Sequence, residues 1–150
     1  MKKLLFVVAA LFAGYSYFNS QYSATPNNAS TAAQIQRADT SDTAIANAFK
    51  NKISNIQVSG QGAVIKLLPD DNDGSRHQKF IVKLANDQTL LIAHNIDLAP
   101  RIGSLREGDS IMFNGQYEWN AKGGVLHWTH RDPKRSHPSG WLQHQGQTYQ

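Results

Sequence analysis

The chain has 150 residues, which suffices for one compact domain of ordinary size. It contains no cysteine, so disulfides, thiol catalysis and thiolate metal sites are excluded. The formal net charge is +4, and without Lys2 and Lys3 thirteen basic residues remain against eleven acidic ones. This bias is well short of that of a dedicated polyanion-binding protein.

Residues 1–18 have the pattern of a targeting segment. Two lysines, Lys2 and Lys3, precede an apolar run from Leu4 to Phe18. The run is shorter than the roughly 20 residues that span a bilayer, yet no clean small-x-small cleavage site follows it directly. We therefore expect export, with residues 1–18 acting either as a cleaved signal peptide or as a retained anchor. The protein would then be periplasmic, or anchored to the inner membrane and facing the periplasm, and would contact the membrane only through residues 4–18 if they are uncleaved.

A polar segment and a short helix are expected next. Residues 19–41 are rich in Asn, Ser, Thr and Ala, which predicts a flexible linker before a single domain over residues 42–150. Ser41 or Asp42 is placed to cap a helix that runs through Lys52. The apolar positions at helical spacing in this segment are Ile45, Ala48, Phe49 and Ile53.

From Gln57 onward the apolar period changes to two, which predicts five strands. Their ranges are 58–68, 77–85, 88–96, 110–120 and 125–132, and the tail from Pro133 is expected to be irregular. The residues predicted to face the core are Phe80, Val82 and Leu84 in the second strand and Ile111, Phe113, Tyr117 and Trp119 in the fourth. Asn86 and Asp87 form a tight turn between the second and third strands.

This order of elements favours a mainly β fold: a small five-stranded OB-like barrel with a short N-terminal helix. The glycines in the first strand suit strong coiling, and a longer connection separates the third strand from the fourth. Gly108-Asp109 suits the entry into the fourth strand of such a barrel. A different five-stranded barrel or an open sheet fits the same pattern.

Several stretches between residues 76 and 141 resemble one family. They are RHQKFIVKL, IAHNIDLAPRI, GDSIMFNGQYEWNAKGGVLHWTHRDP and HPSGW, and the most specific part is HWTHRDP. They are similar to small exported bacterial proteins grouped as domain of unknown function 3465, and the resemblance covers roughly the last two-thirds of the chain. It implies export and a single domain, and it leaves enzyme and binding protein equally open.

The segment 124–144 concentrates the residues that could carry chemistry, with four of the six histidines and two of the three tryptophans. If its strand continues to residue 132, His127 and His130 lie on opposite faces and cannot hold one ion side by side. A metal would need further ligands, for which the candidates are His94, Asp97, Glu118, Asp132 and His137. No known metal-binding spacing is present, so we predict no metal site, and the sequence identifies no cofactor.

The favoured function is an exported, envelope-facing binding module that uses an aromatic and basic surface for a polyanionic or saccharide ligand. Its predicted ligand-binding residues are Arg76, Trp128, His130, Arg131 and Trp141. Stacking aromatics beside basic side chains suit single-stranded nucleic acid, and aromatic faces also suit sugars. Nucleic acid or an envelope polysaccharide is therefore the expected partner class, whereas protein partners are not identified.

The alternative is a histidine-dependent hydrolase, with or without a metal, such as a phosphodiesterase or nuclease. Its predicted catalytic residues are His94, Glu118, His127 and His130, with Arg76 and His77 as further polar groups. His94 shares a face with two apolar residues, so a perturbed pKa is expected if Asp97 or Glu118 lies beside it. No Ser-His-Asp arrangement is recognisable in the sequence. A structural envelope protein without a small ligand is a third possibility.

Two smaller expectations concern the acidic residues. Asp97 and Arg101 flank Pro100 and are predicted to form an ion pair that pins the long connection. Residues 70–73 carry three aspartates but lack the rest of a calcium loop, so we expect a solvated turn.

Overall fold

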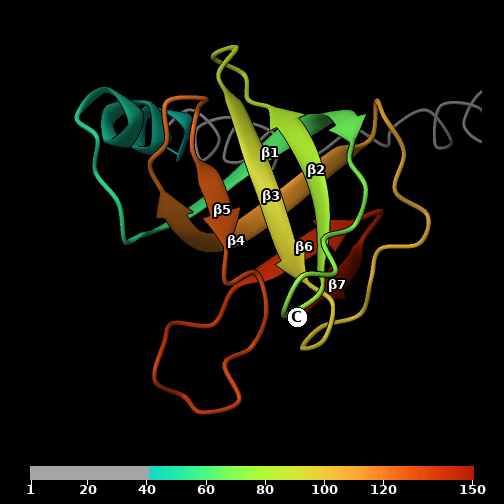
Figure 1. Ribbon diagram of the computed structural model, residues 1–150. Helices are drawn as coiled ribbons and strands as arrows, with labels where there is room; N and C mark the ends of the chain where they lie inside the picture. Colours follow the sequence, from blue (N-terminus) through green and yellow to red (C-terminus); the bar gives the residue numbers. More distant parts are fainter. Residues whose placement is uncertain (1–40) are drawn as a thin grey trace, which may run out of the picture. The chain divides into compact units, whose positions relative to one another are not determined.

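The computed structural model describes residues 41–150, in which one helix is followed by seven strands (Figure 1). The helix covers residues 41–50 of the described range. The strands are β1 (Ile56–Leu67), β2 (His77–Lys83), β3 (Thr89–Asn95), β4 (Ser110–Glu118), β5 (Val125–His127), β6 (Trp141–His144) and β7 (Gln147–Tyr149). The predicted targeting segment and nearly all of the predicted linker lie outside the described residues. Within residues 41–150, no helix has the length and apolar character needed to cross a membrane.

Five of the strands close into a barrel. Their order is β1-β2-β3-β5-β4, and β1 also pairs with β4, so the sheet returns to its first strand. β3 and β5 run parallel, whereas the other neighbouring strands of the barrel are antiparallel. This confirms the predicted mainly β, five-stranded OB-like barrel.

β1 closes the barrel because it is long and strongly coiled. It pairs with β4 through residues 56–63 and with β2 through residues 63–67, with a register shift between Val64 and Lys66. Gly60 lies opposite Phe113, and a Cβ atom at Gly60 would be 2.6 Å from Phe113 Cζ. A glycine is therefore required where β1 passes over this buried ring.

The barrel interior holds the core, as the period-two pattern predicts. The fully buried side chains include Phe80, Leu90, Ile92, Ile111, Phe113, Tyr117, Leu126 and Leu142. Val82 and Leu84 are buried with Phe80, and Trp119 packs against the cluster as a partly buried side chain. The predicted inward faces of the second and fourth strands are therefore confirmed.

The helix lies across one end of the barrel, beside the turn between β4 and β5 (Figure 1). Its buried residues Ile45 and Ala48 join the core, and the Trp119 Nε1–H donates a hydrogen bond to the Phe49 carbonyl at 3.0 Å. Asp42 lies within the helix rather than before it, and its carboxylate accepts a hydrogen bond from the Ala85 N–H at 2.8 Å. The helix ends before the predicted Lys52, and Ile53 is 44% exposed, outside the apolar stripe.

The C-terminal tail differs from the prediction. The last barrel strand ends at His127 rather than at residue 132, because Trp128 adopts a positive φ of 55° and turns the chain away from the sheet. Residues 128–140 form a loop at the opposite end of the barrel from the helix (Figure 1). The tail is not irregular beyond this loop, because β6 and β7 form a hairpin that pairs with β4 and buries Leu142.

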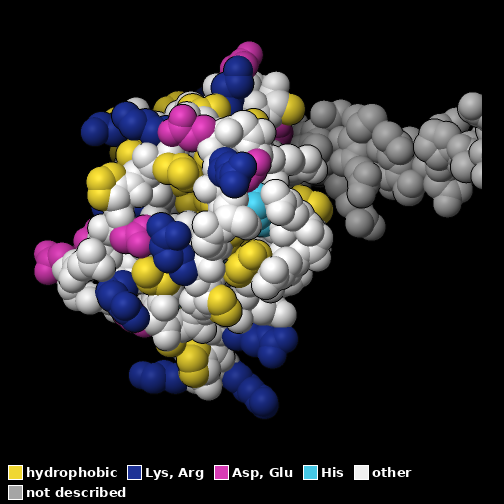
Figure 2. Space-filling model, turned by 90° about the vertical axis from the view of Figure 1, so that its right-hand side faces the viewer, with side chains coloured by type: hydrophobic (Ala, Val, Ile, Leu, Met, Phe, Trp, Pro, Cys, Tyr) yellow, Lys and Arg dark blue, Asp and Glu magenta, His cyan; other side chains and the backbone are white. Residues whose placement is uncertain are grey.

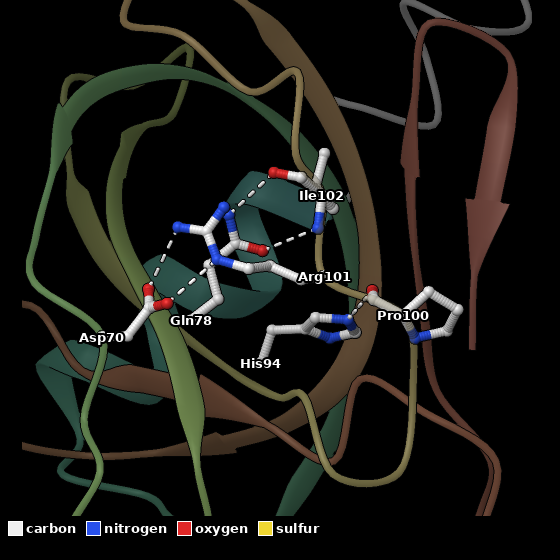
Figure 3. A network of polar contacts seen from close by, with 6 residues as sticks. All are labelled: Asp70, Gln78, His94, Pro100, Arg101 and Ile102. Atoms are coloured by element: carbon white, nitrogen blue, oxygen red, sulfur yellow. Dashed lines mark hydrogen bonds and ion pairs between the residues drawn. The ribbon is translucent and has the colours of Figure 1, made fainter.

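The connection from β3 to β4 is fastened by a buried glutamine (Figure 3). The Gln78 Nε2–H donates to the Ile102 carbonyl at 3.0 Å, and Gln78 Oε1 accepts from the Ile102 N–H at 2.9 Å. Because Gln78 points inward from β2 and Ile102 is fully buried, the pair satisfies polar groups that water does not reach.

The predicted ion pair between Asp97 and Arg101 is wrong. Arg101 Nε lies 2.9 Å from Asp70 Oδ2 (Figure 3). Asp97 instead pairs with Arg76 at 2.7 Å. Each arginine therefore bridges the loop before β2 and the connection after β3, which are distant in sequence. The acidic turn is also more than a solvated loop, because Asp70 is engaged by Arg101.

Candidate functional site

A pocket of about 200 Å³ opens on the outer surface of the barrel, where β2 begins and β3 and β5 end. It is lined by Ser75, His77, Asn95, Leu98, His127, Trp128 and His130, and we call it the histidine pocket. His77 and Asn95 are register partners in β2 and β3, and both face outward because their neighbours Gln78 and His94 face the core. Pairing of the strands therefore brings together residues that are far apart in sequence.

Trp128 is held in an aromatic stack. Its ring is parallel to that of His137, with centroids 4.2 Å apart and planes 10° apart. His130 packs at a tilt, with its centroid 5.4 Å from that of Trp128. The positive φ of Trp128 breaks strand alternation, so Trp128 and His130 line one pocket together with His127. The expectation that strand faces would separate these residues is corrected accordingly.

The loop that carries the stack is organised by Asp132. Its carboxylate accepts hydrogen bonds from the backbone N–H groups of Lys134, Ser136 and His137 at 2.9, 2.6 and 2.8 Å. The Ser136 hydroxyl donates a further bond at 3.0 Å. These bonds, that from Lys134 above all, lower the pKa of Asp132 to about 2. Asp132 is therefore a structural acceptor within the loop.

His137 fastens the stack to β4. Its Nδ1 donates to the Pro138 carbonyl at 2.7 Å, and its Nε2 contacts Oε1 of Gln116. The Gln116 amide in turn donates to Asn55 at 2.8 Å and to Glu118 at 2.5 Å. The loop is thereby held at both its own backbone and the barrel wall.

Two histidines of the pocket are fixed in the same tautomer. Nδ1 of His77 lies 2.7 Å from the Ser75 carbonyl, and Nδ1 of His130 lies 2.8 Å from the Arg131 carbonyl. A carbonyl oxygen only accepts, so Nδ1 carries the proton in each ring. In the neutral imidazole, Nε2 is then left with its lone pair, as a general base requires.

The third histidine, His127, pairs with a carboxylate. Its Nε2 lies 3.7 Å from Glu118 Oε1, beyond hydrogen-bond distance, and this nitrogen is buried without a hydrogen bond from the described residues. Burial lowers the pKa of His127, and the nearby Glu118 only partly opposes that shift. Burial raises the pKa of Glu118, but hydrogen bonds from Gln116 and Ser54 and the nearby His127 together outweigh it, so the net shift is downward.

His94 lies behind the pocket rather than in it. Its side chain is fully buried, and Nδ1 is 2.8 Å from the Thr129 hydroxyl. Nε2 is 3.2 Å from the Pro100 carbonyl (Figure 3). A neutral ring satisfies both contacts, since Nε2–H donates to the carbonyl and Nδ1 accepts from the hydroxyl. Burial lowers the pKa of His94 to about 4. The cause of this shift is desolvation rather than Asp97 or Glu118. Through its contact with the Thr129 hydroxyl, His94 positions the residue that lies between Trp128 and His130 in the chain.

The predicted binding residues are distributed over several places. Trp128 and His130 line the histidine pocket. Arg76 does not line it, although its neighbours in the chain, Ser75 and His77, do, and Arg76 forms an ion pair with Asp97. Arg131 is exposed on the loop. Trp141 lines a different pocket, on the outer surface of β1, β4 and β6. Sequence reasoning missed Ser75, Asn95 and Leu98, which carry no signal until the β2–β3 register is known.

The basic side chains of β2, of the residue before it and of the 128–140 loop fall into two groups. Those on β2 and just before it are neutralised locally: Arg76, Lys79 and Lys83 pair with Asp97, Asp71 and Asp87. By contrast, Arg131, Lys134 and Arg135 are exposed on the loop and form no ion pair within residues 41–150. Figure 2 shows basic and acidic groups interspersed over the barrel, with basic side chains projecting at the lower end, where Figure 1 places the loop.

The candidate metal ligands do not gather. Among residues 41–150 no group of three or more His, Asp or Glu side chains has the arrangement needed to hold a metal ion. Asp132 and His137 contact one another only through the backbone N–H of His137, and Asp97 is taken by Arg76.

The structure also contains a Ser-His-Asp contact that the sequence did not reveal. The buried His144 lies 2.8 Å from Asp109 through Nε2 and 3.5 Å from the Ser104 hydroxyl through Nδ1. The backbone N–H of Arg106, followed by His144, lowers the pKa of Asp109. None of the three residues lines the histidine pocket or the Trp141 pocket, and they tie β6 to the β3–β4 connection.

Comparison with known protein families gives a match over most of the chain. No curated protein matches the chain. Residues 29–150 match the family described as Protein of unknown function (DUF3465), and the match begins inside the segment expected to be a linker. Because it covers most of the sequence, including the whole barrel and its C-terminal hairpin, the chain belongs to this family.

Proposed function

We propose that the protein is an exported binding module that holds a polyanionic chain, single-stranded nucleic acid above all, at the histidine pocket. The observation that carries this proposal is the gathering of Trp128 with three histidines on the outer surface of β2 and β3. OB-type barrels bind oligonucleotides and oligosaccharides on this face. Export rests on the pattern of residues 1–18.

The loop supplies the charge for such a ligand. Arg131, Lys134 and Arg135 have no acidic partner within the described range, so binding a phosphate would not require breaking an ion pair. The cations of β2 would each first have to leave an aspartate. Neutralising three phosphates of a single strand gives a slope of about −2 for log affinity against log salt.

The test is fluorescence anisotropy of labelled single-stranded DNA and RNA with the full chain over a range of salt. Replacing Arg131, Lys134 and Arg135 together by alanine is expected to flatten the salt slope to near zero. Trp128→Ala is expected to weaken binding roughly tenfold, about 1.4 kcal/mol, because it removes a wall of the pocket and the ring against which His130 and His137 pack. Lys122→Ala is the control, because Lys122 is an exposed lysine on the β4–β5 turn, outside the loop. Unchanged affinity in both the triple variant and Trp128→Ala would refute the proposal, and binding of an acidic polysaccharide alone would redirect it to the envelope.

A second function is favoured by one observation: His77 and His130 line one pocket with Nδ1 protonated and Nε2 left as a base. Such a pair could serve as general base and general acid in cleavage of a phosphodiester. One imidazole would take the proton of the attacking hydroxyl, and a protonated one would supply the proton to the leaving oxygen.

This alternative is tested by incubating single-stranded RNA with the full chain, in EDTA and separately with Mg²⁺, Mn²⁺ or Zn²⁺, and resolving the products on gels. Cleavage lost in His77→Ala and His130→Ala, with the circular dichroism spectrum retained, would support it. Binding without cleavage in every condition would exclude this activity on RNA. The variant His94→Gln serves as a comparison, because His94 lies outside the pocket.

A further inference from the structure

A surface without charged residues lies on β1, β4 and β6, in contrast to the basic 128–140 loop beside the histidine pocket. The segments are residues 57–63 of β1, residues 110–116 of β4 and residues 141–143 of β6. Their outward side chains are Gln57, Ser59, Gln61 and Ala63, then Ser110, Met112, Asn114 and Gln116, then Trp141 and Gln143. We call this surface the neutral face.

Strand register arranges these side chains in rows. Ser59, Asn114 and Trp141 are successive register partners across the three strands. Gln61, Met112 and Gln143 form the next row on the same side. Neighbouring strands lie about 4.8 Å apart, and outward residues repeat about every 6.7 Å along a strand. A hydroxyl, several amides and an indole are therefore presented within an area the size of one or two sugar rings.

The polar groups of the neutral face are already oriented by one another. The Gln57 amide donates to Asn114 Oδ1 at 2.6 Å, and the Asn114 amide donates to the Ser59 hydroxyl at 2.6 Å. The Gln61 amide donates to the Ser110 hydroxyl at 2.8 Å. These bonds leave the side-chain carbonyl oxygens of Gln57 and Gln61 and the hydroxyl proton of Ser59 to bond a ligand. Because the side chains are already oriented, they lose little conformational entropy when the ligand binds.

The face is also hollowed beside its tryptophan. A pocket of about 250 Å³ is lined by Ser41, Ser59, Gly60, Gln61, Met112, Phe113 and Trp141. The partly buried Trp141 ring and the exposed Met112 supply an apolar wall, next to hydroxyl and amide groups. Small-ligand sites combine such an apolar wall with a few fixed polar groups, and this volume is slightly below the roughly 300 Å³ at which their usual size range begins.

We propose that the neutral face is a binding site for a neutral saccharide, with Trp141 as the platform for one sugar ring and Ser59, Gln61 and Gln143 as its hydrogen-bonding groups. A sugar offers an apolar ring face and a rim of hydroxyls that donate and accept, which matches an indole bordered by amides. A polyanion gains nothing here, because no cation is present in the three segments. A protein partner typically buries about 800 Å² on each side and uses apolar or charged anchors, of which this face has few.

This site goes beyond the binding proposed for the histidine pocket, since it uses another face and another ligand class. The two sites are separable because Trp128 lines the first and Trp141 the second. Trp128→Ala and Trp141→Ala therefore form a reciprocal pair of variants.

The test is titration of the full chain with chitotriose, cellotriose and maltotriose, up to about 10 mM so that a Kd near 1 mM is detected. Isothermal titration calorimetry reports binding, because its signal does not depend on Trp141, and circular dichroism confirms that each variant is folded. We expect saturable binding of at least one trisaccharide, insensitive to salt, weakened at least about tenfold by Trp141→Ala and unchanged by Trp128→Ala.

Gln61→Ala provides a second variant should Trp141→Ala fail to fold, because Gln61 is exposed and its loss leaves the core intact. It is expected to weaken binding of the same trisaccharide several-fold. Absence of saturation with all three sugars would overturn the proposal, as would undiminished binding by folded Trp141→Ala or by Gln61→Ala. Either result leaves the nucleic-acid measurements on Trp128→Ala and the loop variants unaffected.

Discussion

Acid should destabilise the domain through His94 as the pH falls from about 6.5 to about 4. The His94 pKa falls from an ordinary 6.5 to about 4 because desolvation disfavours the charged ring. The unfolded chain therefore binds a proton between these two values that the folded domain does not accept. The stabilisation from His94 is complete above pH 6.5 and is lost as the pH falls through about 4. Each unit of difference between the pKa values of the folded and unfolded states corresponds to about 1.4 kcal/mol. The shift from 6.5 to about 4 therefore gives a total loss of about 3 kcal/mol in the free energy of unfolding.

The assay is urea unfolding at a series of pH values from 7 to 4, followed by circular dichroism. His94→Gln is the matched variant, because a glutamine can donate to the Pro100 carbonyl and accept from the Thr129 hydroxyl without titrating. The lowered pKa of His127 adds a loss of the same sign, so the difference between wild type and His94→Gln isolates the His94 contribution. Parallel pH profiles for the two proteins would refute this account.

Three further predictions concern single substitutions. Gln78→Met leaves the buried N–H and carbonyl of Ile102 without partners and should destabilise the domain by about 2–4 kcal/mol in urea unfolding. Gly60→Ala places a methyl group 2.6 Å from Phe113 Cζ and should cost about 1–3 kcal/mol in the same assay, by overpacking. Asp132→Asn removes the charged acceptor of the 128–140 loop, so amide exchange should accelerate there while the barrel amides keep their protection.

Matched changes at exposed positions serve as controls. Gln147→Met repeats the glutamine change on the surface of β7, and Gly103→Ala adds a methyl group that meets no atom within 4 Å. Both should leave the free energy of unfolding within about 0.5 kcal/mol of wild type. Asp73→Asn, at another exposed loop, should not alter exchange in the 128–140 loop. Equal effects in a test variant and its control would contradict the corresponding prediction.

The barrel could be predicted because its determinants are local. Alternation of apolar and polar residues specifies which side of each strand is buried, and Phe80 and Tyr117 lie in the core for that reason. The C-terminal hairpin escaped prediction because β6 has four residues and β7 three, too short for a period to be visible. Their strand conformation depends on pairing with β4, which is a tertiary contact.

The candidate site was predictable only in part. The sequence identifies Trp128, His127 and His130 as candidates because they are aromatic or titratable and close together in the chain. Their position around one pocket depends on the positive φ of Trp128. Local propensity disfavours this backbone conformation for a large side chain, and the stack on His137 and the loop bonds to Asp132 accompany it here. Ion-pair partners were not predictable either, because Arg101 reaches Asp70 across 31 positions of the chain.

By itself, the sequence determined that the chain lacks disulfides, that its domain is mainly β and which faces of the second and fourth strands are buried, since composition and periodicity are properties of short segments. Tertiary structure alone decided which polar residues meet. His77 lines one pocket with Trp128 and His130, whereas Trp141 lies on the neutral face. His94 is buried against Thr129 and Pro100, away from any carboxylate. The physical reason is that strand register and barrel closure, rather than distance along the chain, set which side chains share a surface.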